Sequence, residues 1–303
     1  MTGPAGVERS PLRLPREALP SCLRDTRQPP NGLWLLGDRT VLDAAAADCV
    51  AIVGTREASA YGIRTARRLA AAAARAGLVV VSGMARGVDA AAHEACMEAG
   101  GRTIAVLGTG VDVPYPVGHR TLHRAIQDAG AVISEQEPGT RAFPGCFPRR
   151  NRLIASLAST TIVVEAGFKS GAINTASQAN ELSKNVAAVP GPIDDPRSAG
   201  ANHLIRDGAH IVASVEDMLA LCGKAGLANI ERGIHEAPDH HPVEADGSID
   251  RSLLGMLGSL PMAADDLAFS VGLPLKQVAN SLVRLELSGL ARFDGAGYSI
   301  ASG

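Results

Sequence analysis

The feature that most constrains the fold of this chain is a repeated pattern. A short apolar run ends in a glycine-rich or polar turn, and a helix-length segment follows. The runs at residues 49–54, 78–82, 103–107, 131–134, 161–164 and 186–189 are continuous rather than alternating. Continuous runs are typical of strands covered on both faces, as in a parallel sheet between two helix layers. The pattern predicts a doubly wound α/β domain over residues 45–222.

The segments on either side of this domain differ in character. Residues 1–44 are rich in proline and arginine and predict an irregular N-terminal lead-in with one short strand near residues 33–36. Residues 223–247 contain few apolar residues and predict a linker, in which His235, His240 and His241 are interpreted as solvated rather than metal-binding. Residues 248–303 predict three short helices and a hairpin, which together make a small C-terminal winged-helix domain.

Composition excludes several classes of protein. The chain of 303 residues is 46% hydrophobic and carries a net charge of −2, so any polyanion site must be a local patch. Its five cysteines are scattered without CxxC spacing, which indicates reduced thiols and no zinc site. No apolar run approaches the ~18 residues of a membrane span, and the N-terminus lacks a hydrophobic signal core. We expect a cytoplasmic protein without metal or cofactor.

One stretch, residues 79–93, indicates where a ligand binds. Three β-branched residues lead through two glycines and Arg86 into an alanine-rich helix, and such a turn directs free backbone N–H groups at an anion. The other strand-end loops lie at the same edge of a parallel sheet. We therefore expect Arg56, Arg86 and Lys169 to converge there, joined by residues 149–152. Residues 108–110 lack the third glycine of a dinucleotide motif, and residues 168–170 lack the glycines of a P-loop.

Candidate catalytic groups are few. Asp89 is interpreted as a first-turn residue that stabilises its helix, and His93 as a packed or capping residue. Glu165 follows a strand and is expected to hold an arginine or lysine of the rim rather than to act as a general base. Phe168 is compatible with a stacking face for a base or with a core position. The sequence contains no recognisable Ser-His-Asp or Cys-His catalytic set, so we predict that the protein is not an enzyme.

The sequence resembles the DNA-processing protein A family, also called DprA or Smf. The resemblance rests on ordered words over residues 30–220: VGTR at 53–56, SGMARGVDAAAH at 82–93, YP at 115–116, FPRRNR at 147–152, SG at 170–171 and VPG at 189–191. It implies a Rossmann-like domain that binds single-stranded DNA at its strand ends. By position, Arg56, Arg86, Arg150, Arg152 and Lys169 are implied phosphate contacts. Ser82, Gly83, Asn151, Ser170 and Gly171 are implied to shape the pocket.

The resemblance also implies a function and partners. Family members protect incoming DNA during natural transformation and help to load RecA recombinase, and they form homodimers without an established catalytic activity. Residues 1–30 are too short for the helical SAM-like domain with which many members begin, so functions of that domain are not expected here. The winged helix has slightly more carboxylates than cations, which favours a protein-contact or structural role over duplex reading.

Two other functions are compatible with the residues. The strand-end pocket suits a mononucleotide, so one alternative is a nucleotide-binding enzyme or sensor that resembles the phosphoribohydrolases. Residues 165–171, however, lack the PGGxGTxxE word of those enzymes. The second alternative is a transcription regulator that binds duplex DNA through the winged helix. The excess of carboxylates over cations in residues 248–303 argues against this alternative.

Overall fold

The computed structural model describes residues 7–44, 46–225, 248–258, 261–271, 275–294 and 297–301. The chain forms two compact units, residues 1–233 and 234–303. The division falls within residues 226–247, so most of the predicted linker, including its three histidines, lies outside the described residues.

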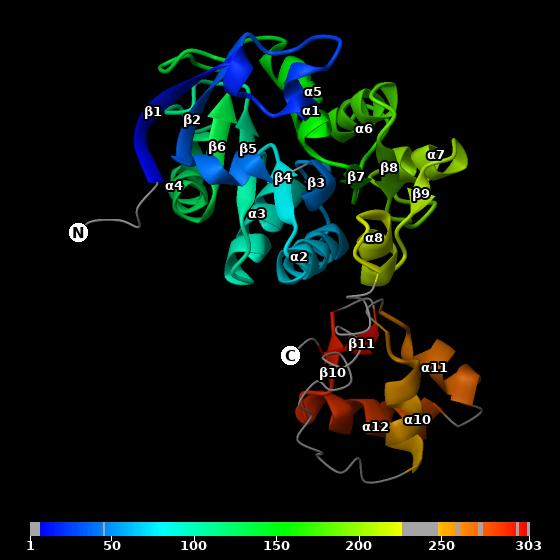
Figure 1. Cartoon of the computed structure of the whole chain (residues 1–303). Helices are drawn as coiled ribbons and strands as arrows, with labels where there is room; N and C mark the ends of the chain where they lie inside the picture. Colours follow the sequence, from blue (N-terminus) through cyan, green and yellow to red (C-terminus); the bar gives the residue numbers. More distant parts are fainter. Residues whose placement is uncertain are drawn as a thin grey trace. The chain divides into compact units, whose positions relative to one another are not determined.

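In its described residues, the first unit contains a nine-stranded sheet in the order β1-β2-β6-β5-β4-β3-β7-β8-β9 (Figure 1). The strands are β1 (Val7–Pro15), β2 (Gly32–Asp38), β3 (Cys49–Val53), β4 (Val79–Ser82), β5 (Thr103–Leu107), β6 (Ala131–Ser134), β7 (Thr160–Val163), β8 (Asn185–Ala188) and β9 (His210–Ile211). Strands β3 to β9 are parallel, whereas β2 runs antiparallel to β6 and β1 antiparallel to β2. The predicted parallel α/β sheet is confirmed.

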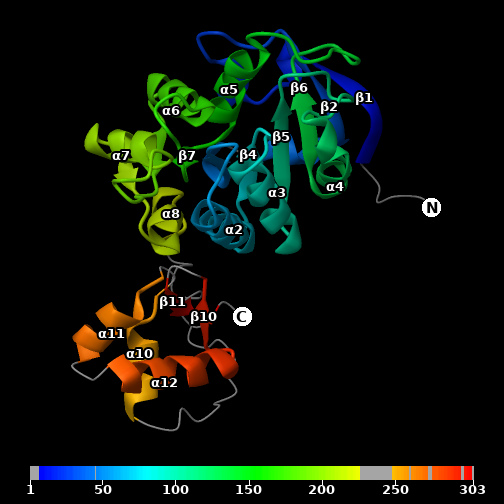
Figure 2. The same ribbon diagram turned by 180° about the vertical axis from the view of Figure 1, so that it is seen from behind.

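Helices cover both faces of this sheet (Figures 1 and 2). One face packs against α2 (Ala60–Arg75), α3 (Val88–Glu98), α4 (Arg120–Ala129) and α8 (Val215–Leu221). The other packs against α1 (Ser21–Arg24), α5 (Cys146–Leu157), α6 (Gly171–Glu181) and α7 (Ala199–Arg206). Short 3₁₀ turns occur at Arg16–Ala18, Arg39–Asp43, Ala46–Asp48 and Val117–His119. Because β3 to β7 are fully buried strands, their continuous apolar runs are explained by helices on both sides.

The expectation of an irregular N-terminal lead-in is wrong for the described residues. Strand β1 pairs with β2 and extends the sheet at its edge, with a register irregularity between Glu8 and Leu12. Pro11 and Pro15 lie in this strand, and an edge strand tolerates proline because one side of its backbone needs no ladder partner. Leu14 and Leu33 are buried in the main core. The lead-in therefore belongs to the α/β domain.

The second unit has the expected order of three helices and a hairpin. Its elements are α10 (Ser248–Met256), α11 (Ala264–Val271), α12 (Leu275–Leu287), β10 (Ala291–Phe293) and β11 (Tyr298–Ile300). Leu253, Leu267, Val278 and Leu282 form its core. The predicted turns between α11 and α12 and between the hairpin strands fall largely at residues 272–274 and 295–296, outside the described residues.

The winding of the sheet reverses between β3 and β7. From β3 the chain adds β4, β5 and β6 on one side, and then returns to place β7 on the other side of β3. The helices that follow these two strands, α2 and α6, pack against opposite faces. In sheets of this kind a crevice opens at the carboxyl ends of the strands at such a reversal.

Candidate functional site

A groove of about 760 Å³ lies at this reversal point. Its walls come from the loops after β3, β4 and β7, from the first turns of α5 and from the residues before α7. A smaller hollow of about 150 Å³ shares Arg56, Arg86 and Phe147 with it and adds Tyr115 and Pro116. The loops that carry Arg56, Arg86 and Lys169 therefore converge in the structure, whereas the strand-end loops at residues 108–110 and 190–192 do not line the groove.

Three of the exposed cations that line the groove follow strands of the sheet. Arg56 follows β3, Arg86 follows β4 and Lys169 follows β7, and each has an exposed side chain. The N-terminus of α6 opens beside them. Ser170 caps that helix by accepting a hydrogen bond from the backbone N–H of Ala172 at 3.3 Å, and Gly171 is its first residue. Free N–H groups and fixed cations at one point favour an anion.

Hydrogen bonds of buried side chains hold the turn after β4. Ser82 is fully buried and its hydroxyl donates to the carbonyl oxygen of Ile52 at 2.6 Å. Asp89, in the first turn of α3, accepts hydrogen bonds from the backbone N–H groups of Gly83 at 3.1 Å and Ala85 at 3.4 Å. This confirms the first-turn interpretation of Asp89. Burial raises the pKa of its carboxyl group, whereas Arg150 and the neighbouring amides act in the opposite direction.

Arg150 belongs to this interior and also lines the floor of the groove and of the smaller hollow. It is 7% exposed, and its guanidinium donates to the carbonyl oxygens of Gly83, at 2.8 Å, and of Val106. Burial lowers its pKa to about 10, while the charge of Asp89 raises it. Its Nη1 group therefore joins the turn that carries Arg86 to β5.

Asn151 joins two elements of the groove wall. Its side-chain amide donates to the carbonyl oxygen of Gly171 at 3.2 Å and to Oδ1 of Asn174 at 3.1 Å. These bonds tie α5 to the first turn of α6. Asn151 also lines the groove, next to the helix that it contacts.

Arg152 points away from the groove. Its guanidinium pairs with Glu135, which follows β6, at 2.7 Å, and both side chains are largely buried. Arg152 is absent from the groove lining in the described part of the chain. The structure thus does not bring Arg152 together with Arg56, Arg86 and Lys169.

Aromatic side chains form a wall that sequence reasoning gave no role. The guanidinium carbon of Arg56 lies 5.3 Å from the ring centre of Phe147, and the rings of Phe147 and Tyr115 are 5.0 Å apart. Both aromatic residues lie in sequence motifs shared with the family, and these motifs were the sequence feature that could have identified them. Phe168 is 65% exposed, so the core position considered for it is wrong, and its ring lies 5.5 Å from that of His203.

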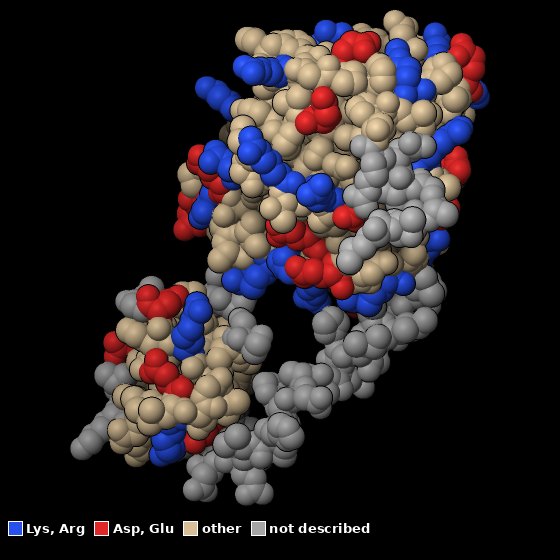
Figure 3. Space-filling model, turned by 90° about the vertical axis from the view of Figure 1, so that its left-hand side faces the viewer, with Lys and Arg blue, Asp and Glu red and all other residues tan. Residues whose placement is uncertain are grey.

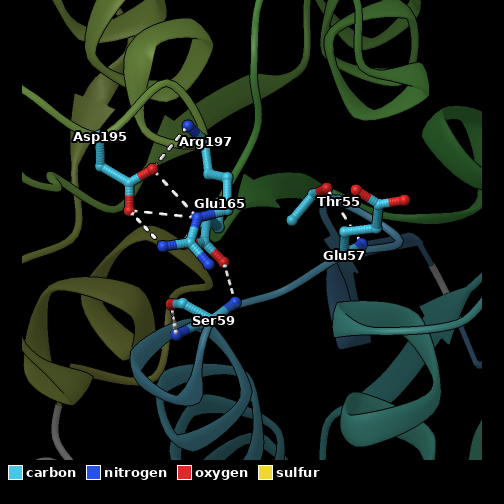
Figure 4. Close-up of polar contacts among 7 residues, drawn as sticks. Thr55, Glu57, Ser59, Glu165, Asp195 and Arg197 are labelled. Carbon is cyan, nitrogen blue, oxygen red and sulfur yellow. Dashed lines mark hydrogen bonds and ion pairs between the residues drawn. The ribbon is translucent and has the colours of Figure 1, made fainter.

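Arg197 makes a further part of the wall, and the buried residue Glu165 lies next to it (Figure 4). Glu165 is 3% exposed, accepts a hydrogen bond from the backbone N–H of Ser59 at 2.8 Å, and lies 4.0 Å from Nε of Arg197. The expectation that Glu165 holds a cation of the rim is confirmed. Arg197 itself was not anticipated, because the sequence gives no sign that the loop before α7 returns to the groove.

His93 is an interior residue, as interpreted. It is fully buried, its Nδ1 lies 2.7 Å from Oγ1 of Thr103, and burial lowers its pKa to about 3. Within the described residues, no three His, Cys, Asp or Glu side chains gather as metal ligands. The helices of the described part are too short or too polar to cross a membrane.

The surface charge is mixed outside the groove. On the face that Figure 3 shows, Lys and Arg side chains of the first unit are interspersed with Asp and Glu. This agrees with the net charge of −2. The groove cations are therefore a local feature and not part of a uniformly basic surface.

Comparison with known proteins gives matches over both units. The family described as DNA recombination-mediator protein A matches residues 12–223, and the DprA winged helix domain matches residues 237–295. A DprA relative from Mycobacterium tuberculosis is 42% identical over 263 residues, which cover 86% of this chain and 66% of the relative. Protein Smf of Escherichia coli is 34% identical over 93% of this chain and 75% of its own length. The chain spans slightly less than two thirds of the length of the mycobacterial relative.

Solved structures agree. DprA from Streptococcus pneumoniae superposes with a TM-score of 0.66 at 37% identity, covering 70% of this chain and 74% of that one. DprA from Helicobacter pylori, described with a single-stranded DNA binding mode, superposes with a TM-score of 0.62 at 30% identity, covering 70% and 94%. The family match over most of the first unit, and the winged-helix match after it, lead to one conclusion: this chain belongs to the DNA recombination-mediator protein A family, also named DprA or Smf.

Proposed function

We propose that the chain binds single-stranded DNA in the groove at the sheet reversal. The observation that carries this proposal is the convergence of Arg56, Arg86 and Lys169 beside the aromatic pair Phe147 and Tyr115. Cations that follow a backbone together with ring faces that accept unstacked bases are the two components of single-strand recognition. The name of the Helicobacter pylori structure reports the same ligand for that relative.

In this proposal one group of residues contacts DNA and a second group supports the walls of the groove. Arg56, Arg86 and Lys169 contact phosphates, with Ser170 and Gly171 offering the N-terminus of α6. Phe147 provides a ring for a base, and Phe168 adds an exposed ring at the rim. A second group fixes the walls without touching DNA: Ser82, Gly83, Arg150 and Asn151.

We infer further that binding serves recombination and needs no catalysis. The bound strand is protected and passed to RecA recombinase during natural transformation or repair, in the cytoplasm, with the protein acting as a homodimer. Membership of the family supports this inference. The winged helix takes a protein-contact or structural part in it. Two α12 side chains, Leu287 at 84% and Val283 at 48% exposed, present apolar surface, and Arg284 is engaged by Asp250 at 2.8 Å.

A nucleotide-binding enzyme is the competing function. It would need a carboxylate in the groove that acts as a general base. The sequence candidate, Glu165, does not line the groove, accepts the N–H of Ser59 and neighbours Arg197, whereas Glu57 lines the groove with an exposed side chain. Product release from AMP by the full chain, abolished in Glu165→Gln, would overturn our proposal in favour of this one.

The direct test is the affinity of the full chain for an oligo-dT, a duplex and AMP at two salt concentrations. Arg86→Glu should weaken oligo-dT binding at least tenfold. It should also reduce the slope of log affinity against log salt concentration by ~0.7 for each phosphate that the protein no longer neutralises. Arg124→Glu on α4 is the matched control, since it makes the same charge change at an exposed position outside the groove lining. Equal oligo-dT affinities for the two variants would contradict the proposal.

A further inference from the structure

The loop between β8 and α7 brings a fourth exposed cation to the groove. Arg197 lines the groove with Pro196, and 47% of its side chain is exposed. It lies in the same cavity as Arg56, Arg86 and Lys169, but its charge is not free. Its guanidinium lies near the carboxylates of Asp195 and Glu165, which differ in burial and in their distance from it.

Asp195 makes the closer contact (Figure 4). Its Oδ1 accepts hydrogen bonds from the backbone N–H of Arg197 at 2.9 Å and from Nε at 3.0 Å, and its Oδ2 accepts from Nη2 at 2.8 Å. These bonds lower the pKa of Asp195, so the carboxylate stays charged at neutral pH. Glu165 stands further off, 4.0 Å from Nε, behind the guanidinium.

The backbone that carries Arg197 is fixed at both ends. The hydroxyl of Tyr61 donates to the carbonyl oxygen of Pro190 at 3.2 Å. Asn202 bonds both backbone groups of Gly191, accepting from its N–H at 3.1 Å and donating to its carbonyl oxygen at 2.9 Å. At the other end the N–H groups of Gly200 and Ala201 donate to the carbonyl oxygen of Ala166 at 2.7 and 3.1 Å. A partner exchange at Arg197 therefore requires only side chains to move.

We propose that Arg197 is a further phosphate ligand of the groove and that Asp195 is its internal counterion, displaced when a DNA phosphate arrives. A phosphate offers the same bidentate acceptor geometry to a guanidinium as a carboxylate does. The Asp195 pair lies at the surface, with 47% of the Arg197 side chain and 20% of the Asp195 side chain exposed, so exchange for a phosphate costs less than it would in the interior. Buried Glu165 stays behind Arg197 and keeps the guanidinium at the groove during the exchange. The displaced Asp195 remains close to the bound strand and repels it, which lowers affinity and favours release.

This inference rests on the proposed function, and a cycle of variants of the full chain with an oligo-dT tests it. Arg197→Gln should weaken binding roughly three- to fivefold and reduce the salt slope by ~0.7, as expected for one phosphate contact on a single strand. Asp195→Asn should tighten binding by a similar factor, because it keeps an acceptor oxygen for Arg197 but removes the competing charge. A gain in affinity cannot arise from misfolding, so this arm is independent of any effect on stability.

Asp194→Asn is the matched control. It removes the same charge from the neighbouring exposed residue of the same loop and should leave affinity nearly unchanged. The decisive comparison is Asp195→Asn in the Arg197→Gln background, where no tightening is expected because the competition acts through Arg197. Tightening of equal size in both backgrounds, or with Asp194→Asn, would show a general charge effect and overturn the proposal.

The same experiment separates this inference from the proposed function. If Arg86→Glu weakens oligo-dT binding and Arg197→Gln does not, DNA binds in the groove and Arg197 is not a ligand. If Arg86→Glu also has no effect, the groove is not the DNA site, and both proposals fail together.

Discussion

Nη1 of Arg150 lies 2.8 Å from the carbonyl oxygen of Gly83, across 67 residues of sequence. The guanidinium also passes over the Cα atom of this glycine, where an ideal Cβ would approach it to 2.5 Å. The buried arginine thus leaves no room for a side chain at this glycine. The contact joins α5 to the turn that presents Arg86, so the interior of the protein determines where a groove cation stands.

Gly83→Ala should lower the free energy of unfolding by about 1–3 kcal/mol, because the new methyl group overpacks a site that cannot relax freely. Denaturant unfolding measures this. Gly118→Ala is the matched control, since nothing lies within 4 Å of its Cβ position. A loss equal to that of the control would mean that Arg150 moves aside without cost.

Phe147→Leu should weaken oligo-dT binding roughly tenfold, since a base stacked on an aromatic ring contributes ~1–3 kcal/mol. The salt slope should stay unchanged, because no charge is removed. Phe143→Leu is the control at an exposed ring outside the groove lining. If Phe147→Leu changes the salt slope but leaves the affinity at low salt unchanged, the ring only orients Arg56 and does not stack on a base.

Arg152→Gln should leave oligo-dT affinity unchanged, in contrast to the phosphate contact implied by the family resemblance. The same variant should lower stability by about 1 kcal/mol or more, because it leaves Glu135 without its ion-pair partner in a largely buried setting. Glu135→Gln should cause a similar loss. DNA affinity that falls with Arg152→Gln but not with Glu135→Gln would restore the direct contact.

His93 should make stability depend on pH. Its pKa falls from an ordinary value of 6.5 to about 3 in the folded state, so the neutral ring contributes stability that is present above 6.5 and is lost as the pH falls toward 3. The expected slope is ~1.4 kcal/mol for each pH unit below 6.5. His93→Asn keeps a polar group near Thr103 but does not titrate. The difference in unfolding free energy between the two proteins should shrink from pH 7.5 to pH 5, and a constant difference would contradict this assignment.

The fold was predictable from sequence wherever strands are buried on both faces. The apolar runs of β3 to β8 are continuous for that reason, and their predicted positions agree with the structure to within about one residue at most boundaries. Strand β1 was missed because it lies at an edge, where Pro11 and Pro15 are compatible with pairing. Helix α7 was missed because it follows a segment rich in proline and glycine and carries Gly200 and Asn202, which are poor helix formers.

The site was predictable only in part. Side chains one residue apart on a helix point about 100° apart, so Arg149, Arg150 and Arg152 cannot all face one groove, and the sequence does not say which one does. Arg197 was missed for a different reason. Its place depends on the path of the loop before α7, which is set by contacts of Tyr61 and Asn202 with residues far from them in sequence.

Glu165 has a consequence for the rate of binding. Its carbonyl oxygen accepts the N–H of Thr55 at 2.7 Å and its carboxylate accepts the N–H of Ser59, so one residue after β7 fastens the loop after β3 at two points. The two halves of the sheet cannot part at the groove without breaking both bonds. A site that is open before its ligand arrives needs no slow rearrangement. Mixing with an oligo-dT should therefore give one association phase that is first order in DNA concentration, without a plateau, and with a rate constant that falls as salt screens the groove cations.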